Sequence, residues 1–220
     1  MLWSSFKILF QKDMKLLFSG SSMFGYALGM VVVMCLSVTL PMSKITVSEV
    51  TVSTLIWIIL FFSCSEVSQR IFLDEETKKT ADLIRQIVPS SVIYLSKVVS
   101  VSIFISIISI TASALLVFWF KMSLNVLPVL LLVMIIGSFA LGISQGIISY
   151  MIARGSARGS VFAIVAIPII LPVLISLINI TTQVLEFKPI SITLVIVVMA
   201  QSLAILITGI LFLPYLEKGV

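Results

Sequence analysis

Long uninterrupted runs of apolar residues dominate the pattern of hydrophobic and polar positions along this chain. A helix needs about 20 apolar residues to cross the hydrocarbon core of a membrane. Six runs meet that length, and they cover approximately residues 21–41, 52–73, 98–120, 126–152, 161–180 and 190–215. A barrel strand would instead alternate apolar and polar positions over about 10 residues. The pattern therefore predicts an all-α integral membrane protein, with six transmembrane helices in a single domain over residues 1–220.

A helical periodicity precedes the first run, in residues 1–18. The apolar residues there recur every three or four positions, at Trp3, Phe6, Phe10, Met14 and Leu17. Such spacing lines one face of a helix, and the three lysines of the segment lie off that face. An aromatic face beside a basic one is typical of a helix in the plane of the membrane surface. The alternative is a basic N-terminus that only sets the topology.

The longest polar segment, residues 74–89 (DEETKKTADLIRQIVP), lies between the second and third runs. Three acids open it, as suits a helix N-terminus, and Pro89 ends it. Asp74 with Lys78 and Glu75 with Lys79 are acid-before-base pairs four residues apart, which stabilise a helix. Its second half is aliphatic, at Leu83, Ile84, Ile87 and Val88. We expect a short helix whose apolar side rests on lipid, on the underside of the bundle, or in a groove of a partner protein.

The composition indicates that lipid surrounds most of the chain, and the distribution of charge indicates its orientation in the membrane. The chain is 60% hydrophobic and 10% charged, with a mean hydropathy of +1.27, whereas a soluble domain is about 25% charged. Of its 14 Lys and Arg residues, the side opposite the N-terminus holds only Lys44, Lys121 and Lys188. Cytoplasmic loops carry the excess of basic residues. We therefore expect both termini in the cytoplasm, and take the net charge of +5 as a topology signal and not as a nucleic-acid-binding surface.

No catalytic or energy-transducing site is visible in the sequence. The chain has no His, the commonest general base and the usual proximal haem ligand. It has no G-x-x-x-x-G-K-[ST] motif, and the glycine-rich turn at Arg158 and Gly159 is expected to be a basic turn on the cytoplasmic side. The only acid within a span, Glu66, stands four residues before Arg70, as in a simple helical ion pair. These features favour neither an enzyme nor an ion-coupled carrier.

Two prolines, Pro168 and Pro172, interrupt the fifth run. Each removes a backbone hydrogen bond and is expected to bend the helix. An ordinary bend and a functional hinge both remain open.

A membrane bundle without its own motor, with an interfacial N-terminal helix and one cytoplasmic helix, resembles the permease half of an ABC-2-type exporter. Within that class, residues 57–98 and 136–175 are similar to the cytochrome c maturation permease family, haem exporter protein B (CcmB). The matching features are Arg70, Phe72, the acidic stretch after them, Lys97, Arg158, Gly159, Pro168 and Pro172. The resemblance covers essentially the whole chain. It departs at Gln69, where the family usually has Glu, and at Lys79, where it tends to have Gly.

The resemblance implies a permease subunit for haem export or delivery in cytochrome c biogenesis. It implies a homodimer that docks on the cytosolic ATPase CcmA and works with CcmC, CcmD and the haem chaperone CcmE. ATP would be hydrolysed on the partner, and haem would be cargo ligated by partners, so that this chain itself holds no cofactor or metal. The expected location is the bacterial inner membrane, or the mitochondrial inner membrane if the chain is organelle-encoded.

On this hypothesis the helix at residues 74–89 is the element that couples the permease to the ATPase. Its expected contact residues are Asp74, Glu75, Leu83, Ile84, Arg85 and Ile87. Structural or hinge roles are expected for Arg70, Lys97, Arg158, Gly159, Pro168 and Pro172. Closure of the ATPase would move spans two and three against span five, through contacts that differ between states. Two other functions remain open: a non-transporting scaffold of the haem-handling complex, and a generic ABC-2 exporter permease for another substrate.

Overall fold

The computed structural model describes residues 2–19, 23–42, 47–78, 80–154 and 160–218. Within these ranges the chain is helical and contains no strand. The helices are α1 (Leu2–Ser19), α2 (Met23–Met42), α3 (Glu49–Thr77), α4 (Thr80–Ile87), α5 (Ser90–Trp119), α6 (Leu127–Arg154), α7 (Ser160–Leu185) and α8 (Ile192–Lys218), with a 3-10 turn at Leu124–Val126. Six of them, α2, α3 and α5 to α8, are long and apolar enough to cross a membrane. The prediction of an all-α protein with six spans is confirmed.

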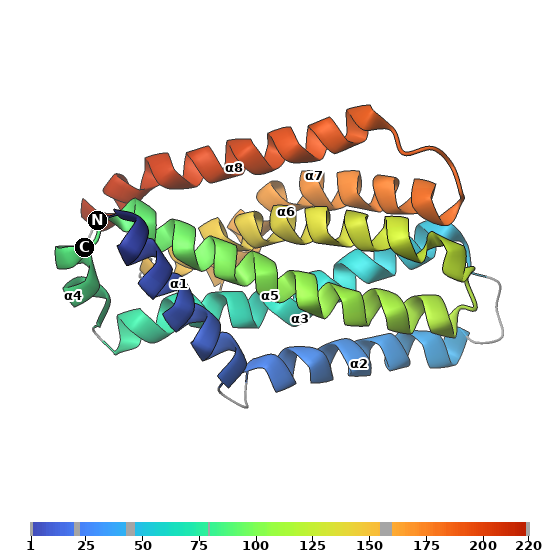
Figure 1. The fold of residues 1–220 in the computed structure, drawn as a ribbon, viewed down its shortest axis with the longest axis horizontal. Coiled ribbons are helices and arrows are strands. Elements are labelled where there is room, and N and C mark those ends of the chain that lie inside the picture. The colour runs from blue at the N-terminus through green and yellow to red at the C-terminus, as the bar shows by residue number, and fades with distance from the viewer. Residues whose placement is uncertain (1, 20–22, 43–46, 79, 155–159, 219–220) are drawn as a thin grey trace.

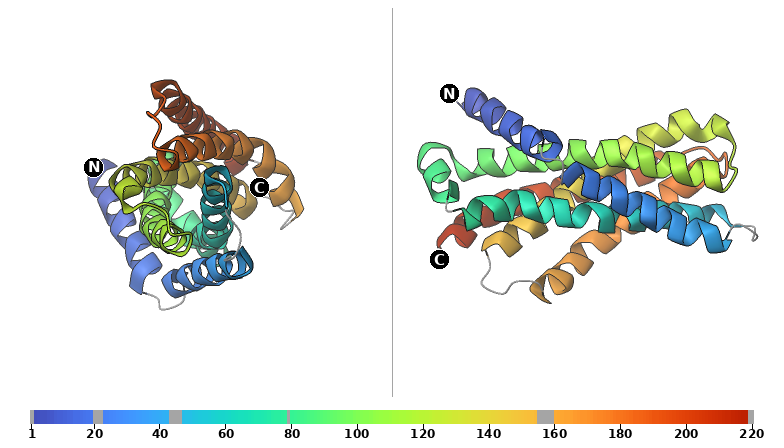
Figure 2. Two further views of the ribbon diagram at one scale, coloured as in Figure 1. Left: turned by 90° about the vertical axis from the view of Figure 1, so that its right-hand side faces the viewer. Right: turned by 90° about the horizontal axis from the view of Figure 1, so that it is seen from below.

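The six long helices lie side by side, and α1 and α4 gather at one end of the bundle, near both termini (Figure 1). The C-terminal ends of α2, α5 and α7 lie at the opposite end (Figure 1). In the middle of the bundle, α6 packs against α3, α5, α7 and α8. Figure 2 shows α2 and α8 on the outside of the bundle. The core therefore forms where α3, α5 and α6 meet.

Small residues of α6 bring the neighbouring helices close. A Cβ at Gly142 would stand 2.7 Å from the Cα of Ser102 on α5, and Gly137 receives the indole of Trp57 from α3. Close approach at small residues is the usual way in which membrane helices pack. Interhelical hydrogen bonds add to it: the Trp57 indole N–H donates to the Thr181 hydroxyl at 2.8 Å.

The polar segment after α3 differs from the single helix expected over residues 74–89. Its three acids form the last turn of α3, which continues to Thr77, and α4 begins only at Thr80. The backbone N–H of Lys78 closes α3 by donating to the Asp74 carbonyl at 3.2 Å. The expected Asp74–Lys78 ion pair is present at 3.9 Å. Lys79, the expected partner of Glu75, lies outside the described residues.

The first helix is present as expected, and Leu17, the last residue of its predicted stripe, is buried. Its buried residues are Leu9, Asp13 and Leu17, spaced four apart, and they pack chiefly toward α5. Trp3, at the start of the predicted apolar stripe, is 78% exposed. The ring of Phe6 stacks on Trp3 with centroids 5.7 Å apart, at the edge of this contact. The stripe therefore turns partly outward, and the position of α1 at the membrane surface stays a prediction.

Candidate functional site

The most exposed apolar residues of α4 form a pair one helical turn apart. Leu83 is 61% exposed and Ile87 is 83% exposed. Between them in sequence, Ile84 turns toward the bundle and packs on the buried cluster of Leu9, Val88 and Ile93. Because residues four apart share a helix face, α4 presents Leu83 and Ile87 outward while Ile84 holds it to the bundle.

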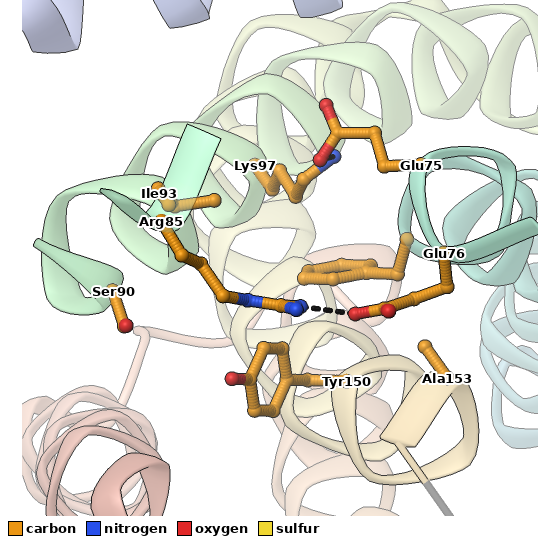
Figure 3. A pocket seen from close by; sticks show the side chains of 9 residues that line it. Glu75, Glu76, Arg85, Ser90, Ile93, Lys97, Tyr150 and Ala153 are labelled. Carbon is orange, nitrogen blue, oxygen red and sulfur yellow. Dashed lines mark hydrogen bonds and ion pairs between the residues drawn. The ribbon is translucent and has the colours of Figure 1, made fainter. Parts of the chain in front are cut away.

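An ion pair also ties α4 to the end of α3. The Arg85 guanidinium donates to the Glu76 carboxylate. Figure 3 shows this pair between the ring of Tyr150 below it and the side chains of Lys97 and Glu75 above it. The pair borders a pocket of about 20 Å³, lined by Phe72, Glu75, Glu76, Arg85, Ser90, Ile93, Lys97, Tyr150 and Ala153. That volume holds about one water molecule, so the site is a packed joint and leaves no room for a larger ligand.

The next charged residue along this joint is Lys97 of α5, which is only 3% exposed. Its ammonium donates to the backbone carbonyl of Ile71 at 2.6 Å and lies 3.1 Å from the Glu75 carboxylate. It also lies over the ring of Phe72, 5.3 Å from the centroid. A buried charge is tolerated when it is paired and hydrogen-bonded, and α3 supplies all three of these contacts.

Two neighbouring residues of α1 complete the arrangement. Asp13, 1% exposed, lies with its Oδ1 atom 3.9 Å from the Lys97 ammonium and 3.2 Å from that of Lys12. Lys12 also donates to Glu75. We call Lys12, Asp13, Glu75 and Lys97 the ion cluster. It contains two acids and two bases from three helices, and each lysine contacts both acids.

The pKa shifts of the two α1 residues show how burial and pairing compete. Burial raises the pKa of Asp13, although the charges of Lys97 and Lys12 act in the opposite direction. Burial lowers the pKa of Lys12, but attraction by Asp13 and the hydrogen bond to Glu75 outweigh it, so the net shift is upward. The partners of Lys12 therefore favour its charged form, whereas Asp13 carries a desolvation penalty that its lysines only partly offset.

Other residues predicted from the sequence lie elsewhere. The Glu66–Arg70 ion pair is confirmed, and Arg70 lies over the ring of Tyr26 on α2, 5.8 Å from its centroid. In α7, Pro168 and Pro172 border a pocket of about 330 Å³ between α6, α7 and α8. Neither contacts the ion cluster. Arg158 and Gly159 lie outside the described residues.

The structure thus brings Glu75, Ile84, Arg85 and Lys97 together and adds residues that the sequence interpretation missed, namely Lys12, Asp13, Glu76 and Tyr150. A signal for Asp13 was available. It is the only acid in residues 1–48, and it stands midway between Leu9 and Leu17 at helical spacing. A lone acid on an apolar register needs a buried base as its partner.

The joint holds charge but offers no visible chemistry. Among the described residues, no group of three or more His, Cys, Asp or Glu is placed to hold a metal ion. Its charges balance each other and its pocket is the size of one water molecule. Its ion pairs connect α1, α3, α4 and α5.

Comparison with known proteins identifies the family of this chain. A search of the curated proteins found no match. The family model described as CcmB protein matches residues 4–216, nearly the whole chain. That family implies a permease of haem export in cytochrome c maturation, a transporter subunit and not a known enzyme. The resemblance carried by residues 57–98 and 136–175 is confirmed, and the chain belongs to the CcmB protein family.

Proposed function

We propose that this chain is the permease subunit of a haem-exporting ABC transporter, and that a partner ATPase acts on it through α4. The observation that carries the proposal is the exposed pair of Leu83 and Ile87 on a helix that Ile84 and Arg85 anchor to the bundle. An amphipathic helix that lays its apolar side in a groove is a common mode of protein recognition. Here the exposed pair is available to a partner, and the anchoring residues transmit the resulting force.

The proposal places α4 and both termini in the cytoplasm of a bacterium, below the inner membrane. Its support is the distribution of basic residues, of which three of 14 fall on the opposite side. The proposed partners are those of the family: a second copy of the chain, the ATPase CcmA, and the haem-handling proteins CcmC, CcmD and CcmE.

In the proposed mechanism, displacement of α4 passes to α3 through the Arg85–Glu76 ion pair and to α5 through the contacts of Lys97 with α3. These helices would then move against α7, where Pro168 and Pro172 each lack a backbone N–H. The missing hydrogen bonds make α7 the span that bends at the lowest cost. Coupling arises because the ATPase contacts α4 differently in its nucleotide-bound and nucleotide-free forms.

The exposed pair gives the direct test. Changing Leu83→Asp together with Ile87→Asp should lower co-purification of the ATPase by about tenfold or more, since central apolar contacts are often worth about 2 kcal/mol. Haem-dependent cytochrome c maturation should fall with it. Thermal stability should stay unchanged because both side chains are exposed.

Gln86→Asp is the matched control, since Gln86 is exposed on the same helix and its change leaves the apolar pair intact. Normal co-purification and maturation in the double variant would refute the role of α4. An ATPase that cannot hydrolyse ATP separates the proposal from a scaffold: maturation should stop for a motor-driven permease and continue for a scaffold.

We further propose that haem is ligated by the partner proteins. With no His in the sequence, only Met, Cys or Tyr remain as conceivable protein ligands for the iron. The chain purified alone should therefore show no stoichiometric Soret band after incubation with haem. A band at a ratio near one haem per chain would contradict this.

A further inference from the structure

We propose that the ion cluster makes α1 a working part of the coupling path, with Asp13 and Lys97 as positioning residues that keep α1, the last turn of α3 and α4 moving as one unit. The inference rests on the proposed function, because it assumes that the ATPase acts on α4. It assigns to α1 a mechanical role in addition to the membrane contact expected from its sequence.

The first step is that α1 shares a buried apolar cluster with α4, the element on which the ATPase would act. Leu9 of α1 belongs to a small buried cluster with Val88 and Ile93, and Ile84 of α4 packs against the same cluster. This cluster is separate from the main core, which Leu17 joins one turn beyond Asp13. A push on α4 therefore reaches α1 through this shared apolar cluster.

The second step is that the last turn of α3 points its two adjacent acids in different directions. Glu76 pairs with Arg85 on α4, while Glu75 pairs with Lys12 on α1 and Lys97 on α5. Because successive residues of a helix point about 100° apart, one turn of α3 can hold α4 by one acid and α1 by the other. The end of α3 is thus the joint at which the two helices meet.

The third step is the burial of the charges. Asp13 is 1% exposed and Lys97 is 3% exposed, and each lysine of the ion cluster contacts both acids. If α1 moved away alone, the remaining Glu75 and Lys97 would lose partners while still largely buried. Uncompensated buried charge is strongly unfavourable. The ion cluster therefore resists independent movement of α1 and favours movement of the whole unit.

The carboxylate of Asp13 also depends on the two lysines of the ion cluster for its partners. Among the described residues, its Oδ2 atom is buried and accepts no hydrogen bond. The two lysines contact the carboxylate through Oδ1. Removing those contacts would leave both oxygens without a partner, which ties the position of α1 to the positions of Lys12 and Lys97.

The test compares variants that change the link while keeping the rest of the joint. Lys12→Met with Asp13→Asn removes one base and one acid, so the remaining Glu75–Lys97 pair stays neutral and buried. Asp13→Glu keeps the charge and is the rescue variant. Glu186→Gln is the control, because it breaks an exposed ion pair with Lys188 at the other end of the bundle.

Two readouts in the assembled complex separate a coupling role from a structural one. Cytochrome c maturation should fall by about tenfold in the double variant, within the usual range of coupling effects, while co-purification of the ATPase is retained. Asp13→Glu should recover most of the maturation, and Glu186→Gln should behave as wild type. Full maturation in the double variant would overturn the inference. Loss of ATPase co-purification in both the double variant and Asp13→Glu would overturn it as well.

Spin-label distances test the inference without relying on any variant of the ion cluster. Spin labels on cysteines at the exposed positions Gln11 and Lys78 measure the distance between α1 and the end of α3. A second pair, at Gln11 and the exposed Ile167, measures the distance between α1 and α7. On trapping the ATP-bound complex, the first distance should stay constant and the second should change. A change in the first distance would show that α1 moves separately and would overturn the inference.

Failure of the proposed function looks different from failure of this inference. If the wild-type chain does not bind the ATPase, or if the Leu83 and Ile87 variant keeps full activity, the role of α4 is wrong. If those results hold as expected but the Gln11–Lys78 distance changes with ATP, only the role of α1 is wrong.

Discussion

Lys97→Met is expected to destabilise the folded bundle by about 3–5 kcal/mol, the range for removing one partner of a buried ion pair. Methionine fills a similar volume but leaves Glu75 and Asp13 with Lys12 as their only base in the ion cluster. It also removes the hydrogen bond to the Ile71 carbonyl. The measurement is thermal unfolding of the detergent-purified protein.

Lys188→Met is the matched control, because Lys188 pairs with Glu186 in an exposed position. An exposed ion pair contributes about 0–1 kcal/mol, so this variant should unfold close to the wild-type temperature. Equal unfolding temperatures for the two methionine variants would show that the charge of Lys97 is not needed for folding.

Gly142→Val is expected to be the second most damaging change, with a loss of about 3 kcal/mol or more from overpacking. A Cβ at this position would clash with the Oγ atom of Ser102 and would lie 2.7 Å from its Cα atom. The side-chain oxygen can rotate away, but the backbone atom cannot, so α5 and α6 must separate. Thermal unfolding again measures the effect.

The same substitution at Gly29 provides the comparison. A Cβ on Gly29 of α2 meets nothing within 4 Å, so Gly29→Val should leave the unfolding temperature of the isolated subunit nearly unchanged. A similar loss of stability at both glycines would mean that the contact with Ser102 does not limit the packing of α5 on α6.

How far the sequence predicts this protein depends on how local each feature is. The six spans follow from run length alone, since lipid leaves a continuous apolar segment no alternative to a helix that satisfies its own backbone. The Glu66–Arg70 pair follows from spacing within one helix. The outward pair on α4 was among the predicted contact residues, although the sequence did not separate Leu83 and Ile87 from the anchoring Ile84.

Features that depend on contacts between helices were predicted less well. The apolar stripe of α1 predicted a contact with the membrane surface, whereas the face that packs on the bundle and contains Asp13 was not predicted. Hydrophobicity favours Trp and Phe for burial wherever they occur, and it cannot reveal that a base on α5 is available to neutralise an acid. Likewise, Lys97 stands just before the predicted span over residues 98–120, whereas α5 begins at Ser90 and carries Lys97 two turns inside.

The sequence by itself determined that this chain is a six-span membrane protein of the CcmB family with one short amphipathic helix between spans. Those properties reside in the length, order and periodicity of segments. Only the tertiary structure decided that Glu75 pairs with Lys12 and Lys97. The physical reason is that a buried charge is strongly unfavourable unless an opposite charge lies beside it. Residues 12, 75 and 97 are far apart in the sequence, and only the packing of the helices brings them to one place.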